Sequence, residues 1–361
     1  MVGRRCRAAL IFSALCFCSV TAFCAGTPDA LAKLQNVHRI VFLGDSITYA
    51  GEYVDDVEAY YVTRFPDMHL EFINLGLSSE TVSGLSEPGH AGGKYRRPDL
   101  HERLGRVLDK TKPDLAFVCY GMNDGIYQPL DEARLKAFQD GMKSVHEQIA
   151  ATGAKVIHLT PPVFDPVPIK EKLSTNGAAG FSHPYEGYNQ VLDRFSEWLL
   201  SQRAAGWDVA DLHGPMNHWL AEQRKRDANF NFTKDGVHPD VNGHWIMAKQ
   251  ILIYLGASDI KNADSHLAML AGWHNYPDLM KLIVNKQELL RDAWLTETRH
   301  TRPGVKAGLP LPEAEAKAAE MDKQLRELAR TSENRSLLSP GTKTNWRGFD
   351  RYVILKYAAN L

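Results

Sequence analysis

Two stretches of the chain hold residues that together can carry out acyl transfer. Gly44, Asp45 and Ser46 directly follow an apolar run at 39–43. A serine that follows a strand and a glycine can project its hydroxyl from a tight strand-to-helix turn, and its own amide then points towards an incoming carbonyl oxygen. Taken alone this triplet is a weak signal, because a serine at such a position also serves as the N-cap of the next helix.

The second stretch contains Asp235 and His238, just before an expected helix at 241–255. An Asp and a His three residues apart on one turn can pair the carboxylate with one imidazole nitrogen. The other nitrogen is then free to take the proton of a serine hydroxyl, which is the arrangement a serine nucleophile needs. The alternative is a capping aspartate with a partly exposed histidine.

Amide groups after two further apolar runs can stabilise a developing negative charge. Gly76 follows the run at 69–75, and Asn123 follows the run at 114–120. Glycine allows close approach to a backbone amide, and asparagine supplies a side-chain donor, so together they can form an oxyanion hole. Ordinary turn chemistry also explains the glycine, and an Asx turn also explains Asn123 followed by Asp124.

These stretches can meet only if the apolar runs before them belong to one sheet. The apolar runs lie at 39–43, 69–75, 114–120, 155–160 and 207–212. Helical spacing of apolar residues is found at 51–65, 98–110, 131–152, 185–204 and 241–255. This alternation predicts an α/β fold with a parallel sheet covered by helices on both faces. Right-handed crossovers bring the carboxyl ends of the strands to one edge, where we expect the site.

In this order and context, the chain resembles the GDSL/SGNH hydrolase family over about residues 38–256. The matching residues are Ser46 in the Gly-Asp-Ser block, Gly76 in the Asn-x-Gly block, Asn123 in the Gly-x-Asn-Asp block, and Asp235 with His238 in the Asp-x-x-His block. One departure is minor, since Ile47 stands where the four-letter name has leucine. Four ordered blocks are far more specific than any one of them.

The resemblance implies a three-layer, flavodoxin-like fold, the SGNH hydrolase fold, with no metal and no organic cofactor. It implies that Ser46 is the nucleophile, His238 the base and Asp235 the acid that orients it. The expected oxyanion donors are the amides of Ser46 and Gly76 and the side chain of Asn123. The chain has neither an HExxH sequence nor a dinucleotide-binding glycine pattern, and it lacks the Gly-x-Ser-x-Gly elbow of α/β-hydrolases.

The two ends of the chain differ from this central part. Residues 1–25 combine three arginines, a short apolar run and small residues, which predicts a signal peptide. An uncleaved membrane anchor is the alternative, disfavoured because the apolar run is short. We expect a hydrolase domain over 26–256 and a helical C-terminal extension over 257–361, with amphipathic helices at 278–295 and 313–330 that pack onto the main domain.

Composition narrows the range of partners. The formal net charge is −1, from 42 basic and 43 acidic residues, so no strong field favours nucleic acid or an anionic surface. Cys119 is the one cysteine after the leader and is expected to be a small buried hydrophobe, which leaves no disulfide framework. We expect no integral membrane contact, and the oligomeric state stays open.

Together these features predict an exported serine esterase, periplasmic or secreted, that removes acetyl or similar short acyl groups from carbohydrate. Export and the mild charge favour a polar substrate. Lipase, lysophospholipase or thioesterase activity is the alternative within the same class of enzyme. A catalytically idle carbohydrate-binding protein is the alternative from another class, although an intact set of Ser46, Asp235 and His238 argues against it.

Overall fold

The computed structural model describes residues 28–331. Five parallel strands form one sheet in the order β2-β1-β3-β4-β5. They are β1 (Arg39–Gly44), β2 (Glu71–Asn74), β3 (Leu115–Cys119), β4 (Lys155–Leu159) and β5 (Asp208–Ala210). All five residues of β3 are buried, because helices cover both faces of the sheet. Each predicted strand is present, and β2 and β5 are the shortest of the five.

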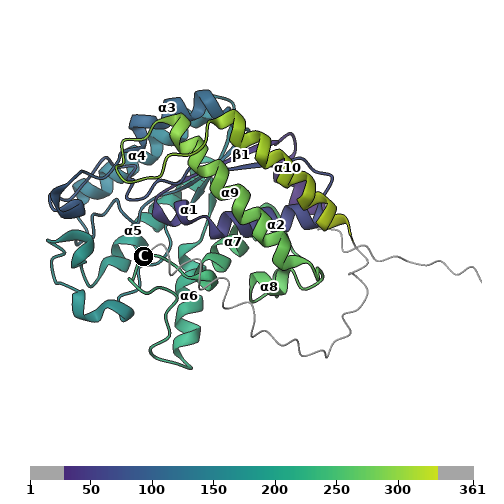
Figure 1. The fold of residues 1–361 in the computed structure, drawn as a ribbon. Coiled ribbons are helices and arrows are strands. Elements are labelled where there is room, and N and C mark those ends of the chain that lie inside the picture. The colour runs from purple at the N-terminus through teal and green to yellow at the C-terminus, as the bar shows by residue number, and fades with distance from the viewer. Residues whose placement is uncertain (1–27, 332–361) are drawn as a thin grey trace, which may run out of the picture.

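Helices form a layer on each face of the sheet, as predicted (Figure 1). Helices α2 (Glu52–Arg64) and α7 (Val241–Leu255) pack together on one face. On the other face lie α3 (Leu100–Thr111), α4 (Glu132–Ala150) and α5 (Tyr188–Ser201). The chain therefore has the three-layer α/β fold of SGNH hydrolases. Cys119 is buried and free at the end of β3, as expected from its apolar surroundings.

Sequence patterns did not reveal three further helices. These are α1 (Ser46–Ala50), α6 (His213–Arg224) and α8 (His266–Met269). Two of the three are too short to show a helical period. In α6 the pair Gly214-Pro215 marks a loop in the sequence, but a proline is tolerated in the first turn of a helix, where its missing N–H would have no partner.

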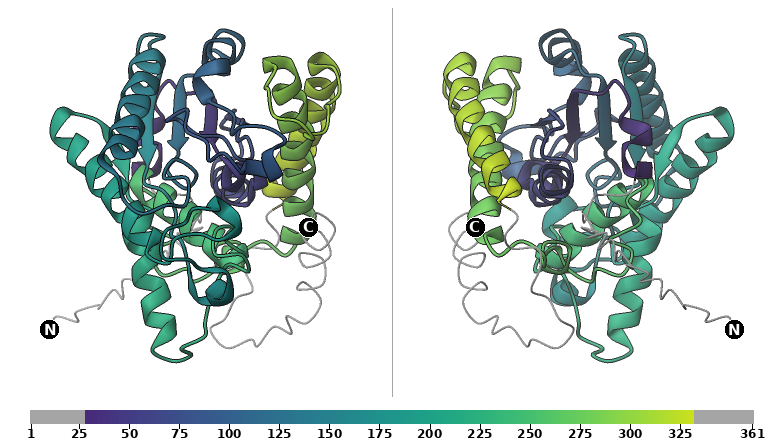
Figure 2. Two further views of the ribbon diagram at one scale, coloured as in Figure 1. Left: turned by 90° about the vertical axis from the view of Figure 1, so that its left-hand side faces the viewer. Right: turned by 90° about the vertical axis from the view of Figure 1, so that its right-hand side faces the viewer.

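The two long helices near the C-terminus are α9 (Tyr276–Thr298) and α10 (Leu311–Arg330). Figure 2 shows them side by side along one flank of the sheet. Helix α9 packs against α2 and the edge strand β2, and α10 packs against α9 and α2. The described part of the predicted C-terminal extension thus covers the outer edge of the sheet.

A buried polar network joins α9 to the rest of the fold. The Lys286 ammonium pairs with the carboxylate of Glu58 on α2, and both side chains are under 5% exposed. Gln287 donates to the same carboxylate at 2.6 Å and to the carbonyl oxygen of Phe72 in β2 at 3.1 Å. Because each buried charge has a partner, their attraction offsets the cost of removing both charges from water.

Two expectations concern membranes and the leader. Within residues 28–331, every helix is too short or too polar to cross a bilayer. The predicted signal peptide, residues 1–25, lies outside the described residues.

Candidate active site

Ser46 stands at the tight turn that joins β1 to α1. Asp45 is the N-cap of α1, and its carboxylate accepts a hydrogen bond from the Ile47 amide at 2.9 Å. Ser46 is the first residue of the helix, so the capping role falls to its neighbour. At Gly44 an added Cβ would lie 2.0 Å from the hydroxyl oxygen of Thr48, so only glycine fits this turn.

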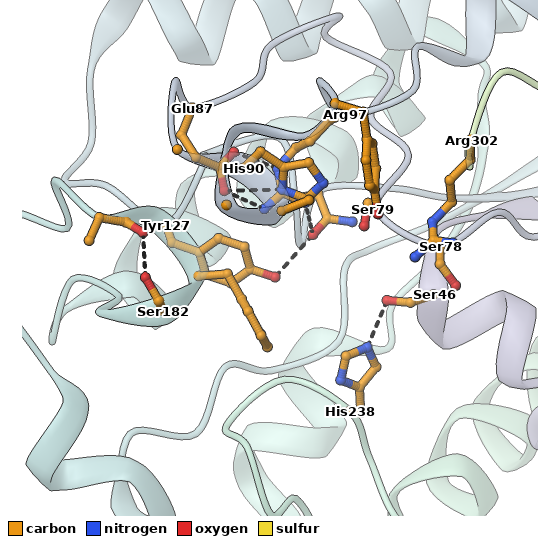
Figure 3. A pocket seen from close by; sticks show the side chains of 17 residues that line it. Ser46, Ser78, Ser79, Glu87, His90, Arg97, Tyr127, Ser182, His238 and Arg302 are labelled. Carbon is orange, nitrogen blue, oxygen red and sulfur yellow. Dashed lines mark hydrogen bonds and ion pairs between the residues drawn. The ribbon is translucent and has the colours of Figure 1, made fainter. Parts of the chain in front are cut away.

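The structure brings together the three residues predicted as a triad. The Nε2 atom of His238 lies 2.8 Å from the Oγ of Ser46, as Figure 3 shows. Its Nδ1 atom lies 2.6 Å from a carboxylate oxygen of Asp235. The other oxygen of that carboxylate accepts the amides of Val237 and His238, at 3.0 and 2.9 Å. The backbone of this turn therefore fixes the acid, and the acid fixes the imidazole.

Electrostatics in this arrangement favour a basic imidazole. Burial alone would lower the pKa of His238, but the hydrogen bond and the charge of Asp235, with a contribution from Asp45, raise it above the ordinary value. Burial alone would raise the pKa of Asp235, yet its bonds to His238 lower that pKa to about 2. At neutral pH, Asp235 is therefore an anion beside a ring able to accept a proton.

Asn123 lines the same pocket, and hydrogen bonds to neighbouring residues fix the orientation of its side-chain amide. Its side-chain oxygen accepts hydrogen bonds from Arg97 Nη1 at 2.9 Å and from the Tyr127 hydroxyl at 3.0 Å. Its NH₂ group donates to the carbonyl oxygen of Glu80 at 3.2 Å. Since that group carries two hydrogens, a second donor remains for a ligand. Arg97 is itself held by two 2.7 Å bonds to Glu87.

Asp124 braces the loops around the site. One oxygen of its carboxylate accepts the amides of Val82 and Ser83 at 2.8 Å, and the other accepts the Gly121 amide at 2.9 Å. These bonds tie the loop after β2 to the loop after β3. Asp124 therefore holds the loops around the site in place, as Asp45 does at the turn before α1.

The structure contradicts the predicted role of Gly76 as an oxyanion donor. The amide of Gly76 donates to the side-chain oxygen of Asn74 at 2.9 Å, and the residue does not line the pocket. A Cβ at this position would lie 2.3 Å from the backbone nitrogen of Tyr49. Glycine is therefore needed here so that the loop after β2 can pack against the backbone of α1.

Ser79, three residues further along, is the candidate donor in this loop instead. It lines the pocket with Ser46 and has a left-handed backbone conformation, with φ at 69°. Within residues 28–331 its amide donates no hydrogen bond. Sequence reasoning missed it because a serine gives no signal of a positive φ, which glycine adopts far more readily.

A cavity of about 450 Å³ opens beside Ser46 and His238. Its wall contains Glu87 and His90 from the loop after β2. Glu80, from the same loop, is fully buried and pairs with Arg103 instead. The lining residues that sequence reasoning did not single out include Arg97, Tyr127, Phe181, Ser182 and Arg302. No group of three His, Cys, Asp or Glu side chains in the described part of the chain can hold a metal ion.

The parallel sheet, with Ser46, His238 and Asp235 in contact at its carboxyl edge, defines the class of protein. It is an ester hydrolase with a serine nucleophile. The model of the GDSL-like Lipase/Acylhydrolase family matches residues 42–246, and the chain belongs to that family. No curated protein matches the chain.

Solved structures with a similar fold are distant in sequence. BT4096, a gut microbial diltiazem-metabolizing enzyme, is 24% identical, with a TM-score of 0.49 over 61% of this chain and 47% of its own. This chain thus spans about half the length of that protein. A catalytic mutant of Axe2, an acetylxylan esterase from Geobacillus stearothermophilus, is 20% identical, with a TM-score of 0.46 over 61% of this chain and 94% of its own.

Proposed function

We propose that this acylhydrolase is an exported serine esterase that removes acetyl or similar short acyl groups from carbohydrate. The observation that carries the proposal is the continuous hydrogen-bonded series Asp235–His238–Ser46 at the wall of an open cavity. A hydroxyl within 2.8 Å of an imidazole nitrogen is ready to lose its proton as it attacks a carbonyl carbon.

The reaction uses the donors around Ser46. His238 takes the hydroxyl proton while Ser46 Oγ bonds to the ester carbonyl carbon, and the carbonyl oxygen becomes an oxyanion. The amides of Ser46 and Ser79 and the NH₂ of Asn123 stabilise that charge. His238 then gives the proton to the departing alcohol, which leaves an acyl-enzyme. A water molecule, deprotonated by His238, releases the acid by the same steps.

The polar side chains that line the cavity favour a substrate with a short acyl group and a polar alcohol. The cavity wall near Ser46 contains Ser78, Ser79 and the ion pair of Glu87 with Arg97. A long acyl chain placed against the hydroxyls of Ser78 and Ser79 would remove them from water without giving them partners. Phe181 is 42% exposed, and its ring centre lies 6.5 Å from that of His238, so it offers an aromatic face to the apolar side of a sugar ring.

Export rests on the sequence of residues 1–25, which has the layout of a secretory leader. Cleavage near residue 25 delivers the enzyme to the periplasm or the medium, where it meets acylated polysaccharide. N-terminal sequencing of the protein recovered from its native host tests this part. A mature chain that still begins at Met1 would contradict it.

Activity is tested with purified wild type, Ser46→Ala and, as a matched control, Ser78→Ala, which removes a neighbouring pocket hydroxyl. On acetylated sugars and a nitrophenyl ester series, we expect the wild type to be fastest with acetyl and Ser46→Ala to lose turnover by several orders of magnitude. Rates that rise with chain length would instead show a lipase-like enzyme. A folded wild type whose Ser46 fails to react with a phosphonate probe would favour the idle binding protein.

A further inference from the structure

One wall of the cavity comes from outside the part of the chain that matches the family. Arg302 follows α9 and lines the cavity together with Ser46, whereas the family match ends at residue 246. In Figure 3 its side chain extends towards Ser46 and Ser78. The C-terminal region therefore contributes a positive charge to a site whose reacting groups all lie earlier in the chain.

The segment that carries Arg302 is fixed to helices α3 and α9. Arg106 on α3 donates to the carbonyl oxygens of Thr298 at 2.9 Å and Arg299 at 2.7 Å, just past the end of α9. On the other side of Arg302, the Gly308 amide donates to the hydroxyl of Thr296 at 2.8 Å. Because both flanks are bonded back to ordered helices, the guanidinium is presented to the cavity by a defined loop.

Arg302 differs from the other arginine in the cavity in its charge balance. Arg97 is neutralised by Glu87, whereas Arg302 forms no ion pair within residues 28–331. Its Nη1 donates to the carbonyl oxygen of Pro303 at 3.0 Å, and its Nε is buried without a hydrogen-bond partner among those residues. Its guanidinium lies 5.7 Å from the centre of the Tyr95 ring. Nη2 has no hydrogen-bond partner among those residues and is thus the nitrogen left for a ligand.

A second polar atom without a hydrogen-bond partner lies in the same wall of the cavity. The Nε2 atom of His90 is buried without a hydrogen-bond partner among the described residues, and its ring meets the Tyr95 ring edge-on at 5.2 Å. Buried polar groups that lack partners are costly to a fold. A carboxylate suits this wall because a guanidinium forms strong, charge-assisted hydrogen bonds with it.

We infer that Arg302 binds a carboxylate on the alcohol part of the substrate, so that the enzyme selects acyl esters of acidic sugars over those of neutral sugars. This rests on the proposed function and narrows it. Bound in this way, the carboxylate accepts a hydrogen bond from Nη2 of Arg302, and the ester group reaches Ser46. Arg302 is the one arginine among the described lining residues that has no ion-pair partner, and it then determines specificity.

The test compares two esters that differ only in charge: a mono-acetylated methyl glucuronoside and the methyl glucoside acetylated at the same hydroxyl. For the wild type we expect kcat/KM to be roughly tenfold or more higher for the acidic ester. Arg302→Gln should remove this preference mainly through KM, and Arg302→Lys should keep only part of it because lysine lacks the planar fork. Lys306→Gln removes a charge from the same loop outside the cavity and should leave the preference unchanged.

Two results would overturn the inference about Arg302 while leaving the proposed function intact. One is a wild type that hydrolyses both esters with equal kcat/KM. The other is an Arg302→Gln variant that loses activity on both esters by the same factor. If the wild type hydrolyses neither ester nor any nitrophenyl acetate, the proposed function itself fails, and the inference fails with it.

Discussion

The imidazole of His238 lies 2.8 Å from the hydroxyl of Ser46, although 192 residues separate them in the chain. The two come together because β1 and the loop before α7 end at the same edge of the sheet. No conformational change is needed to form this contact, which is the geometry that a general base requires.

Asp235→Asn should lower kcat by about a thousandfold or more and shift the pH profile. Activity requires neutral His238, so kcat/KM falls as the pH drops through the pKa of that ring. With its own pKa of about 2, Asp235 stays ionised over this range and raises the pKa of His238. Removing its charge lowers the pKa of His238, so the acid limb of the residual activity should move to lower pH.

The measurement is the residual kcat/KM of Asp235→Asn against pH, with Asp240→Asn as a control. Asp240 is the N-cap of α7 and bonds to backbone amides of that helix, not to the imidazole of His238. If the acid limb of Asp235→Asn lies at the same pH as the acid limb of wild type, Asp235 does not set the pKa of His238.

Ser79→Gly should keep nearly all of the activity, within about threefold. Glycine retains the backbone amide and adopts a φ of 69° more easily than serine does. Asn123→Ala, by contrast, removes a side-chain donor and should cost on the order of 3 kcal/mol of transition-state stabilisation. Steady-state kinetics of the two variants shows whether Ser79 acts through its backbone amide or through its hydroxyl. Equal losses in both would mean that the hydroxyl of Ser79 takes part in the reaction.

The sequence predicted which loops form the site more reliably than which atoms act in it. Apolar runs located all five strands, and parallel topology then required the loops after them to converge. The assignment of Gly76 was wrong, because two kinds of glycine look alike in a sequence. One kind frees an amide for a ligand, while Gly76 allows two backbone segments to pack, with Tyr49 only 2.3 Å from where a Cβ would be.

The C-terminal region shows a second limit of sequence reasoning. Apolar spacing predicted α9 and α10 as helices, but it did not predict that Arg302 reaches the cavity. That placement depends on contacts between distant segments, such as Arg106 bonding to the end of α9. A loop rich in glycine and proline carries no period from which such contacts can be deduced.

Lys286→Met should lower the free energy of unfolding by about 3–5 kcal/mol, because it leaves the Glu58 carboxylate buried without its charge partner. The double variant Lys286→Met/Glu58→Gln should recover part of this loss, since neither buried charge then remains. Urea unfolding of the three proteins measures both effects. A single variant that loses less than about 1 kcal/mol would show that α9 is not held to α2 by this pair.

Asp45→Asn should reduce the pH dependence of stability between about pH 4 and pH 7. Burial raises the pKa of Asp45 to about 7, although the Ile47 amide and the charge of His238 act to lower it. A carboxyl whose pKa is raised by folding stabilises the fold at low pH, and that contribution is lost as the pH rises through the folded value. Asparagine keeps the N-cap hydrogen bond without a charge, so the variant should resist this decline.

The comparison is the free energy of unfolding at pH 4, 6 and 8 for wild type, Asp45→Asn and Asp131→Asn. Asp131 caps α4 in the same way through the Arg134 amide, but it is exposed. Because Asp131 lacks the burial that Asp45 has, we expect its replacement to leave the slope of stability with pH close to that of wild type. Wild type should lose stability from pH 4 to 8 more steeply than Asp45→Asn, and parallel slopes for the two would show that Asp45 is already ionised in the folded protein at pH 4.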